Sequence, residues 1–199
     1  MDIQRLSQIE NVLKRKMAFM AGISRLIWEK TNRMPVIVGG HAVEMYTHGG
    51  YTSEDIDVKA PRDALTSVLK DLGFEHDGMH FFHKDLDIYI QWLGEGLDPV
   101  FENPDKAIDV EVDPANALYV RVIGAEDLVI DRLSAYKFWK DSDSKVWASR
   151  ILDAVAETGE LEIDVEYMRR RAREEDVLDV LEEIIAESPA LKSPSPRLG

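Results

Sequence analysis

The sequence predicts an α+β protein in which a β-sheet is flanked by helices, with an N-terminal helix and a C-terminal helical segment. Apolar residues recur every three or four positions over residues 3–30, short β-branched runs punctuated by Gly and Pro follow up to residue 123, and helical spacing returns from Ala125. We therefore divide the chain into a core with its N-terminal helix at 1–124, a C-terminal helical segment at 125–188 and a flexible tail at 189–199.

The composition excludes several classes of protein. The chain has 199 residues and no cysteine, so disulfides, thiolate metal sites and a cysteine nucleophile are ruled out. No apolar run approaches the ~18 residues that a membrane span needs. The N-terminus lacks the basic and apolar regions of a signal peptide, so we expect a cytoplasmic protein that has no membrane partner.

The charge of the chain is strongly negative but uneven. A net charge of −14 disfavours general coating of nucleic acid, because the phosphate backbone is repelled. Residues 1–34 nevertheless contain seven Lys or Arg against three acidic residues. This segment is either a solvated helix face or a surface that faces an anionic substrate, and the charge pattern allows both interpretations.

The predicted elements follow one another closely. Pro35 leads into a strand that ends at Gly39-Gly40, a short helix follows, and a strand is expected over 55–59. A helix begins at Pro61 and runs to about Leu72. Further strands are expected at 79–83, 86–92, 108–113 and 119–123, and helices at 125–139, at 146–156 and from Asp164 as N-cap onward.

The chemistry is concentrated in two short stretches. Glycines 39 and 40 allow close approach of a phosphate, and the helix after them offers free N–H groups to an anion. Asp55 and Asp57 lie two apart on a strand, so both face one side, where two carboxylates together favour a bound cation. Mg²⁺ or Mn²⁺ fits such oxygen ligands.

A third carboxylate would complete a two-metal arrangement. Asp87 supplies it in our interpretation, because it alternates with the apolar residues Leu86, Ile88 and Ile90 on an expected neighbouring strand. Competing candidates are Asp85, Asp109 and Glu111. His76, His80 and His83 have spacings that suit a zinc site on a helix, but the segment is predicted to be a hairpin, so no zinc site is expected.

The pattern of an apolar strand, Gly39-Gly40, a fourteen-residue spacer, Asp55-Ile56-Asp57-Val58 and a later Leu86-Asp87-Ile88 resembles the nucleotidyltransferase superfamily with the DNA polymerase β-like fold. It is most similar to small prokaryotic members, the minimal and the abortive-infection-type toxin–antitoxin nucleotidyltransferases. These also place a helix that opens in Glu-Asp-Leu after the core, as residues 126–128 do here. The resemblance covers roughly residues 34–155 and implies a mixed sheet.

The resemblance implies roles for individual residues. Gly39 and Gly40 would hold the nucleotide phosphates, Asp55 and Asp57 would bind the metals, and Asp87 would bind a metal and act as base toward the acceptor hydroxyl. His41 is expected either to contact phosphate or to cap the helix that follows the glycines.

Two positions depart from the resembled pattern. Many members have serine where Gly40 stands, and the abortive-infection type has a lysine near Arg132. Arg132 is therefore a candidate phosphate ligand, with Lys137 and Lys140 as substitutes on the same helix.

The predicted function is metal-dependent transfer of a nucleoside monophosphate from a nucleoside triphosphate to a hydroxyl on a protein, an RNA or a small molecule, in a toxin–antitoxin or phage-defence setting. The alternative is a catalytically weak binding module of the same fold that pairs with a cognate toxin or antitoxin protein.

Overall fold

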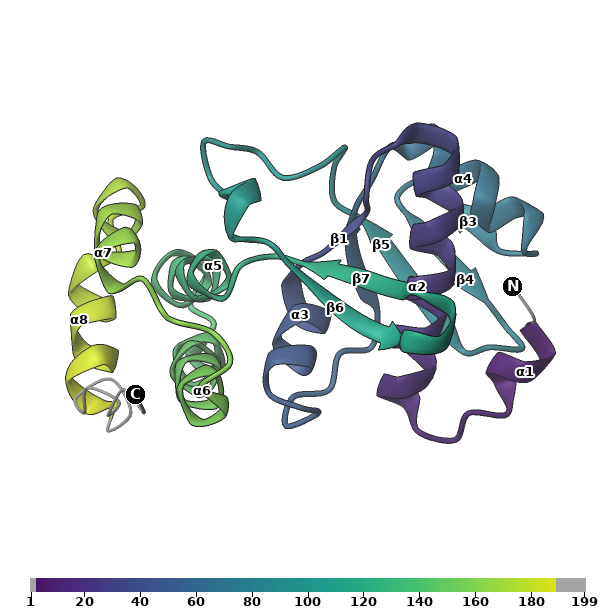
Figure 1. Cartoon of the computed structure of the whole chain (residues 1–199). Coiled ribbons are helices and arrows are strands. Elements are labelled where there is room, and N and C mark those ends of the chain that lie inside the picture. The colour runs from purple at the N-terminus through teal and green to yellow at the C-terminus, as the bar shows by residue number, and fades with distance from the viewer. Residues whose placement is uncertain (1–2, 189–199) are drawn as a thin grey trace. The chain divides into compact units, whose positions relative to one another are not determined.

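The structure, a computed structural model, describes residues 3–188, so the predicted tail at 189–199 lies outside the described part. The chain forms two compact units, Met1–Gly124 and Ala125–Gly199 (Figure 1). Among the described residues, no helix is long and apolar enough to cross a membrane.

A seven-stranded mixed sheet forms the centre of the first unit (Figure 1). Its order is β3-β4-β5-β2-β1-β7-β6. The elements of this unit are α1 (Ile3–Ser7), α2 (Val12–Thr31), β1 (Val36–Ile37), α3 (Gly39–Tyr46), β2 (Ile56–Lys59), α4 (Arg62–Asp71), β3 (Glu75–Asp77), β4 (His80–His83), β5 (Ile88–Trp92), η1 (Pro104–Lys106), β6 (Ile108–Asp113), η2 (Pro114–Asn116) and β7 (Leu118–Val122).

The strand pairing confirms the predicted α+β class. β2 runs antiparallel to β1 and parallel to β5, and β1 runs parallel to β7. The hairpins β3–β4, β4–β5 and β6–β7 are antiparallel. The short strand Glu75–Asp77 has three exposed residues and no apolar alternation, which is why the sequence did not indicate it.

The core lies on one face of the sheet. Ile56 and Ile90 are register partners on β2 and β5, and both are almost completely buried. Phe19 of α2 packs on Phe74 with ring centroids 5.2 Å apart. Because side chains alternate along a strand, the residues between these apolar positions, such as Asp57, point to the opposite face. The alternation therefore separates the hydrophobic core from the polar face that carries the candidate site.

The N-terminal helix is broken, which corrects the prediction of one helix over residues 3–30. α1 ends at Ser7, and the amides of Gln8 and Ile9 bond back to its carbonyls. A new helix begins at Val12, because the side chain of Asn11 accepts a hydrogen bond from the amide of Lys14 at 2.8 Å. The apolar spacing continues through this break, so periodicity alone did not reveal it.

The second unit consists of helices in its described part. These are α5 (Ala125–Trp139), α6 (Ser142–Thr158), α7 (Val165–Glu174) and α8 (Leu178–Glu187). The predicted N-cap is confirmed, since Asp164 accepts a hydrogen bond from the amide of Tyr167 at 2.9 Å. The single helix predicted after it is wrong, because the backbone turns between α7 and α8, where Asp176 has a φ of 56°.

Candidate active site

The glycine turn serves first to bring a carboxylate against the start of α3. Gly39 has a φ of +56°, and a Cβ there would overlap the carboxylate of Asp57. The amide of Gly40 donates a hydrogen bond to Asp57 Oδ2 at 2.9 Å. Asp57 therefore lies at the positive end of α3, where an anion is stabilised.

Ser53 approaches the second glycine, and the sequence did not single it out. A Cβ at Gly40 would lie 2.8 Å from Ser53 Oγ, so the serine hydroxyl fills the space beside this glycine. The same hydroxyl donates toward Asp55 Oδ1 at 3.4 Å. Ser53 thus places a hydroxyl beside the second glycine of the turn and next to Asp55.

A buried charge network lies beneath these residues. Lys16 Nζ on α2 donates to the backbone carbonyl of Ser53 at 2.5 Å and lies 3.4 Å from Glu44 Oε2 on α3. The same oxygen of Glu44 accepts from the amide of Ser53 at 3.4 Å and contacts His41 Nδ1 at 3.0 Å. The network joins α2, α3 and the segment that leads into β2, and so fixes the backbone that carries Asp55.

His41 supports the site from inside the protein. Its side chain is 0% exposed, so it reaches no solvent in this conformation, and α3 is capped at Val38 without a side-chain bond. Burial lowers the pKa of His41, although the hydrogen bond that His41 donates to Glu44 opposes this shift. A neutral ring donates from Nδ1 to Glu44, which leaves Nε2 buried without a hydrogen-bond partner. The expected phosphate contact of His41 remains a prediction.

The pKa of Glu44 is held below its usual value. Burial alone would raise it, but the hydrogen bond with His41 and the charge of Lys16 outweigh that effect. Glu44 is therefore ionised and forms a buried ion pair with Lys16.

The third predicted ligand does not lie on a strand, which corrects that part of the prediction. Asp87 precedes β5 in a turn, has a φ of 50° and is exposed. The register pairs Asp57 with Gln91, so the side chain beside Asp57 on the neighbouring strand is an amide. Leu86 and Asp87 continue the alternation of buried and exposed side chains although both lie in the turn before β5. Alternation alone therefore did not show where the strand begins.

The three predicted carboxylates do not form a metal-binding group. Within residues 3–188, no set of three or more His, Cys, Asp or Glu side chains is arranged to hold a metal ion. The binding of Mg²⁺ or Mn²⁺ by Asp55 and Asp57 stays a prediction, and such an ion commonly takes one or two carboxylates and completes its shell with phosphate oxygens and water.

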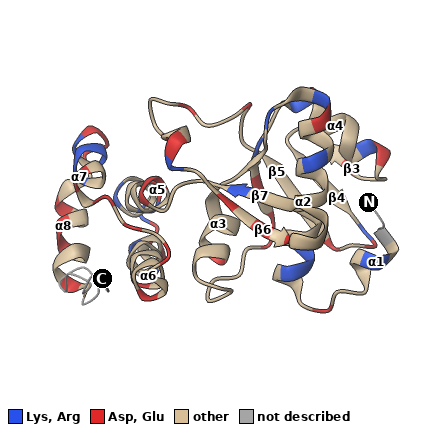
Figure 2. Ribbon diagram, in the orientation of Figure 1, with Lys and Arg blue, Asp and Glu red and all other residues tan. Residues whose placement is uncertain are grey.

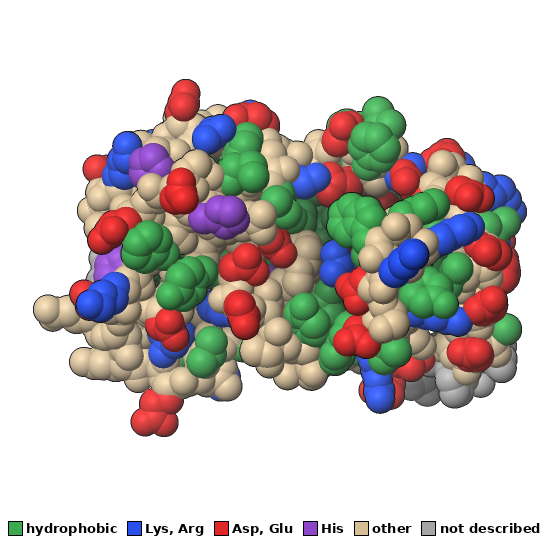
Figure 3. All heavy atoms as spheres, turned by 180° about the vertical axis from the view of Figure 1, so that it is seen from behind, with side chains coloured by type: hydrophobic (Ala, Val, Ile, Leu, Met, Phe, Trp, Pro, Cys, Tyr) green, Lys and Arg blue, Asp and Glu red, His purple; other side chains and the backbone are tan. Residues whose placement is uncertain are grey.

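A cavity of about 770 Å³ adjoins Asp55. Its lining includes Asp77 and His80 from the β3–β4 hairpin, Phe82 from β4, Asp87 from the turn before β5, and Tyr89 from β5 itself. Figure 3 shows the rear of the molecule, where acidic, histidine and apolar side chains lie beside one another on the surface of the first unit. The cavity thus has a mixed acidic and aromatic wall.

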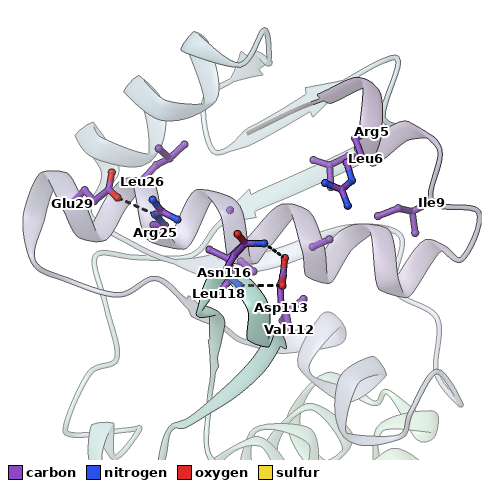
Figure 4. A pocket seen from close by; sticks show the side chains of 13 residues that line it. Arg5, Leu6, Ile9, Arg25, Leu26, Glu29, Val112, Asp113, Asn116 and Leu118 are labelled. Atoms are coloured by element: carbon purple, nitrogen blue, oxygen red, sulfur yellow. Dashed lines mark hydrogen bonds and ion pairs between the residues drawn. The ribbon is translucent and has the colours of Figure 1, made fainter.

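A second cavity of about 510 Å³ lies in the same unit between the N-terminal helices and the turn from β6 to β7 (Figure 4). Its polar side chains contact one another, since Arg25 bonds Glu29 and Asn116 bonds Asp113. Figure 2 shows the basic residues of this unit mainly on its helices, and α2 alone carries Lys and Arg at several positions. None of the carboxylates predicted at the active site lines this cavity.

The two predicted cationic phosphate ligands lie on α5 in the second unit. Arg132 forms an ion pair with its neighbour Asp131 at 2.5 Å. Lys137 donates to Asp179 Oδ1 at 3.1 Å and to the carbonyl of Asp176. Both cations therefore have acidic partners within their own unit, and their contact with nucleotide stays a prediction.

Solved structures with the same fold were found by comparison of the coordinates. One is an antigenic nucleotidyltransferase-like protein from Paracoccidioides brasiliensis, with a TM-score of 0.58, 14% sequence identity and coverage of 92% of this chain and 93% of that one. Another is the antibiotic-resistance factor ANT(2'')-Ia, with a TM-score of 0.51, 15% identity and coverage of 94% and 100%. No protein-family model and no curated protein matches the sequence. The mixed sheet, the glycine turn against the acidic strand and these similarities together show that the chain has the nucleotidyltransferase fold.

Proposed function

We propose that the protein transfers a nucleoside monophosphate from a nucleoside triphosphate to a hydroxyl acceptor, with Mg²⁺ or Mn²⁺ bound by Asp55 and Asp57. The observation that carries this proposal is the placement of Asp57 at the start of α3, through the Gly40 amide, with Asp55 two residues before it. Asp57 lies on the polar face of β2 and Asp55 lies in the bend just before this strand, and two such carboxylates would supply oxygen ligands to a metal that carries a triphosphate.

In the proposed reaction, the residues of the site hold the metal and fix the orientation of its two carboxylate ligands. The acceptor oxygen attacks the α-phosphorus, the bond from this phosphorus to the bridging oxygen breaks, and pyrophosphate leaves with the electron pair. The bound metal would neutralise charge on the triphosphate. The Gly40 amide orients Asp57 and the Ser53 hydroxyl orients Asp55, so both ligands are positioned before substrate arrives.

The proton of the acceptor hydroxyl must be removed when its oxygen attacks phosphorus, and a positioned base would speed this step. A carboxylate next to Asp57 would accept this proton, but Gln91 occupies that position and an amide is not a base at neutral pH, so the proton passes to water instead. This observation favours a second candidate function, a nucleotidyltransferase-fold binding module with weak chemistry and a cognate toxin or antitoxin protein as partner. Arg132 and Lys137 remain proposed phosphate ligands in both functions.

Incubation of the full chain with Mg²⁺ and each labelled nucleoside triphosphate tests the proposal. We expect pyrophosphate release that depends on acceptor and is lost in Asp55→Ala and Asp57→Ala. Release that persists in both variants would refute the metal assignment. Nucleotide binding without release, measured by equilibrium dialysis at millimolar Mg²⁺, would support the binding module instead.

A further inference from the structure

The cavity beside Asp55 has an excess of negative charge. Its wall includes four carboxylates, from Glu54, Asp55, Asp77 and Asp87, and one cation, Lys16. Lys16 is buried and bonded to the Ser53 carbonyl and to Glu44, so its charge is balanced within the protein. A ligand in this cavity therefore meets a negative potential, which attracts cations and repels phosphate groups.

The same cavity has an aromatic wall. Tyr89 at the start of β5 is 52% exposed, and its ring stacks on that of Phe82 with centroids 6.4 Å apart and planes 21° apart. Exposed aromatic faces next to carboxylates are favourable surroundings for ammonium groups, because the ring face carries negative charge. The aromatic pair and the carboxylates thus select for the same ligand chemistry independently.

We infer that this cavity binds the acceptor and that the acceptor is a small cationic compound, an amine-bearing alcohol. This inference rests on the proposed function, and it names the substrate class of the same site. Asp55 belongs both to the proposed metal site and to the cavity wall, so a ligand in the cavity would present its hydroxyl next to the proposed metal and phosphate. The volume of about 770 Å³ lies within the range of small-molecule sites.

The other acceptor classes fit this wall poorly. An RNA end would bring phosphates against four carboxylates, and the net charge of −14 adds to this repulsion. A protonated amine cannot attack phosphorus because it has no lone pair. The ammonium groups therefore anchor the ligand, while a free hydroxyl of the same molecule acts as the nucleophile.

Two sugars with matched hydroxyl skeletons test the inference. The probes are the β-1,4-linked disaccharide of glucosamine, which carries two ammonium groups, and its neutral N-acetylated counterpart. Calorimetric titration of the full chain without nucleotide measures binding alone. We expect the amino sugar to bind at least about ten-fold more tightly than the acetylated one, with an affinity that falls as salt rises.

A second set of titrations measures how substitutions in the cavity wall change the affinity for the amino sugar. Tyr89→Ala should weaken binding of the amino sugar about five-fold, whereas Tyr89→Phe keeps the ring and should bind as the wild type does. Asp77→Asn should weaken it about three-fold, while Asp71→Asn at the exposed end of α4 serves as the charge-matched control and should have no effect.

The outcomes separate this inference from the proposed function. Equal affinities for both sugars, tighter binding of an RNA oligonucleotide, or no effect of Tyr89→Ala would overturn the cationic acceptor. Pyrophosphate release with neutral acceptors alone would keep the proposed function and refute the inference. Selective binding of the amino sugar without pyrophosphate release from any nucleoside triphosphate would keep the cavity as a cation site and count against the transferase.

Discussion

The candidate site has two sides, one formed by β2 and the segment before it and the other by β5 and the turn before it, and they differ in the contacts that hold their acidic side chains in place. On the β2 side, Asp57 bonds the Gly40 amide, and the segment before Asp55 rests on the buried Lys16–Glu44 pair. On the β5 side, Asp87 lies in an exposed turn and Tyr89 is half exposed. Under the proposed function, the rigid side would hold the metal and the phosphates, and the exposed side would admit the acceptor.

The rigid side depends on buried charge, which makes it sensitive to single changes. Glu44→Ala removes the partner of Lys16 and leaves its ammonium buried beneath Ser53. We expect the free energy of unfolding to fall by about 3–5 kcal/mol, as for other buried pairs that lose one member. Urea unfolding followed by circular dichroism measures this loss.

A surface ion pair in the same unit is the control for this variant. Glu29→Ala removes the exposed partner of Arg25 on α2 and should cost about 1 kcal/mol or less. Equal losses from Glu29→Ala and Glu44→Ala would mean that the buried network adds nothing to the fold. The contrast between β2 and β5 would then have no energetic basis.

Removing a carboxylate from each side of the site should therefore have unequal effects. Asp57→Asn should lower pyrophosphate release by about 10²–10³-fold, because the proposed metal loses a ligand held in place before binding. Asp87→Asn should change the rate constant at saturating acceptor by less than about three-fold and act mainly on the KM for the acceptor. A loss from Asp87→Asn as large as that from Asp57→Asn would restore Asp87 as the third metal ligand.

Gln91 offers a way to complete the site rather than to damage it. Gln91→Glu puts a carboxylate next to Asp57 on the neighbouring strand, where it can accept the proton of the acceptor hydroxyl or bind metal. We expect the rate of pyrophosphate release to rise about ten-fold, which is less than the rate increase that a well-positioned general base usually contributes. Gln91→Ala is the matched control and should not increase the rate; a decrease with Gln91→Glu would show that a third negative charge is harmful here.

Local patterns predicted the β2 side well. The glycine turn follows from the freedom of the glycine backbone, and the position of Asp57 on the polar face of β2 follows from strand alternation. The predicted strand over 55–59 begins one residue later, at Ile56, so Asp55 lies in the bend before β2 and alternation does not fix its side chain. The mixed sheet followed from the family resemblance. The contacts that hold this side were not predictable, because Lys16 reaches a serine 37 positions away in the sequence.

The β5 side shows where periodicity fails. Leu86, Ile88 and Ile90 are all buried and alternate with Asp87, as the sequence indicated. Alternation is satisfied equally by a turn residue and by a strand residue, and only the hydrogen-bond register reveals that Gln91 is the partner of Asp57. The same reasoning explains the continuous helix predicted over 3–30, where apolar spacing persisted across the break at Asn11.

The smallest expected effect concerns the buried histidine under the rigid side. Burial lowers the pKa of His41 from its ordinary value of 6.5, so as pH falls the unfolded chain takes up this proton before the folded protein does. The stabilisation is therefore complete above pH 6.5 and is lost progressively as the pH drops below it. His41→Asn keeps a donor toward Glu44 but cannot titrate, so its unfolding free energy should depend less on pH than that of the wild type. Parallel pH curves for the two proteins would show that His41 does not contribute to the acid sensitivity of the β2 side.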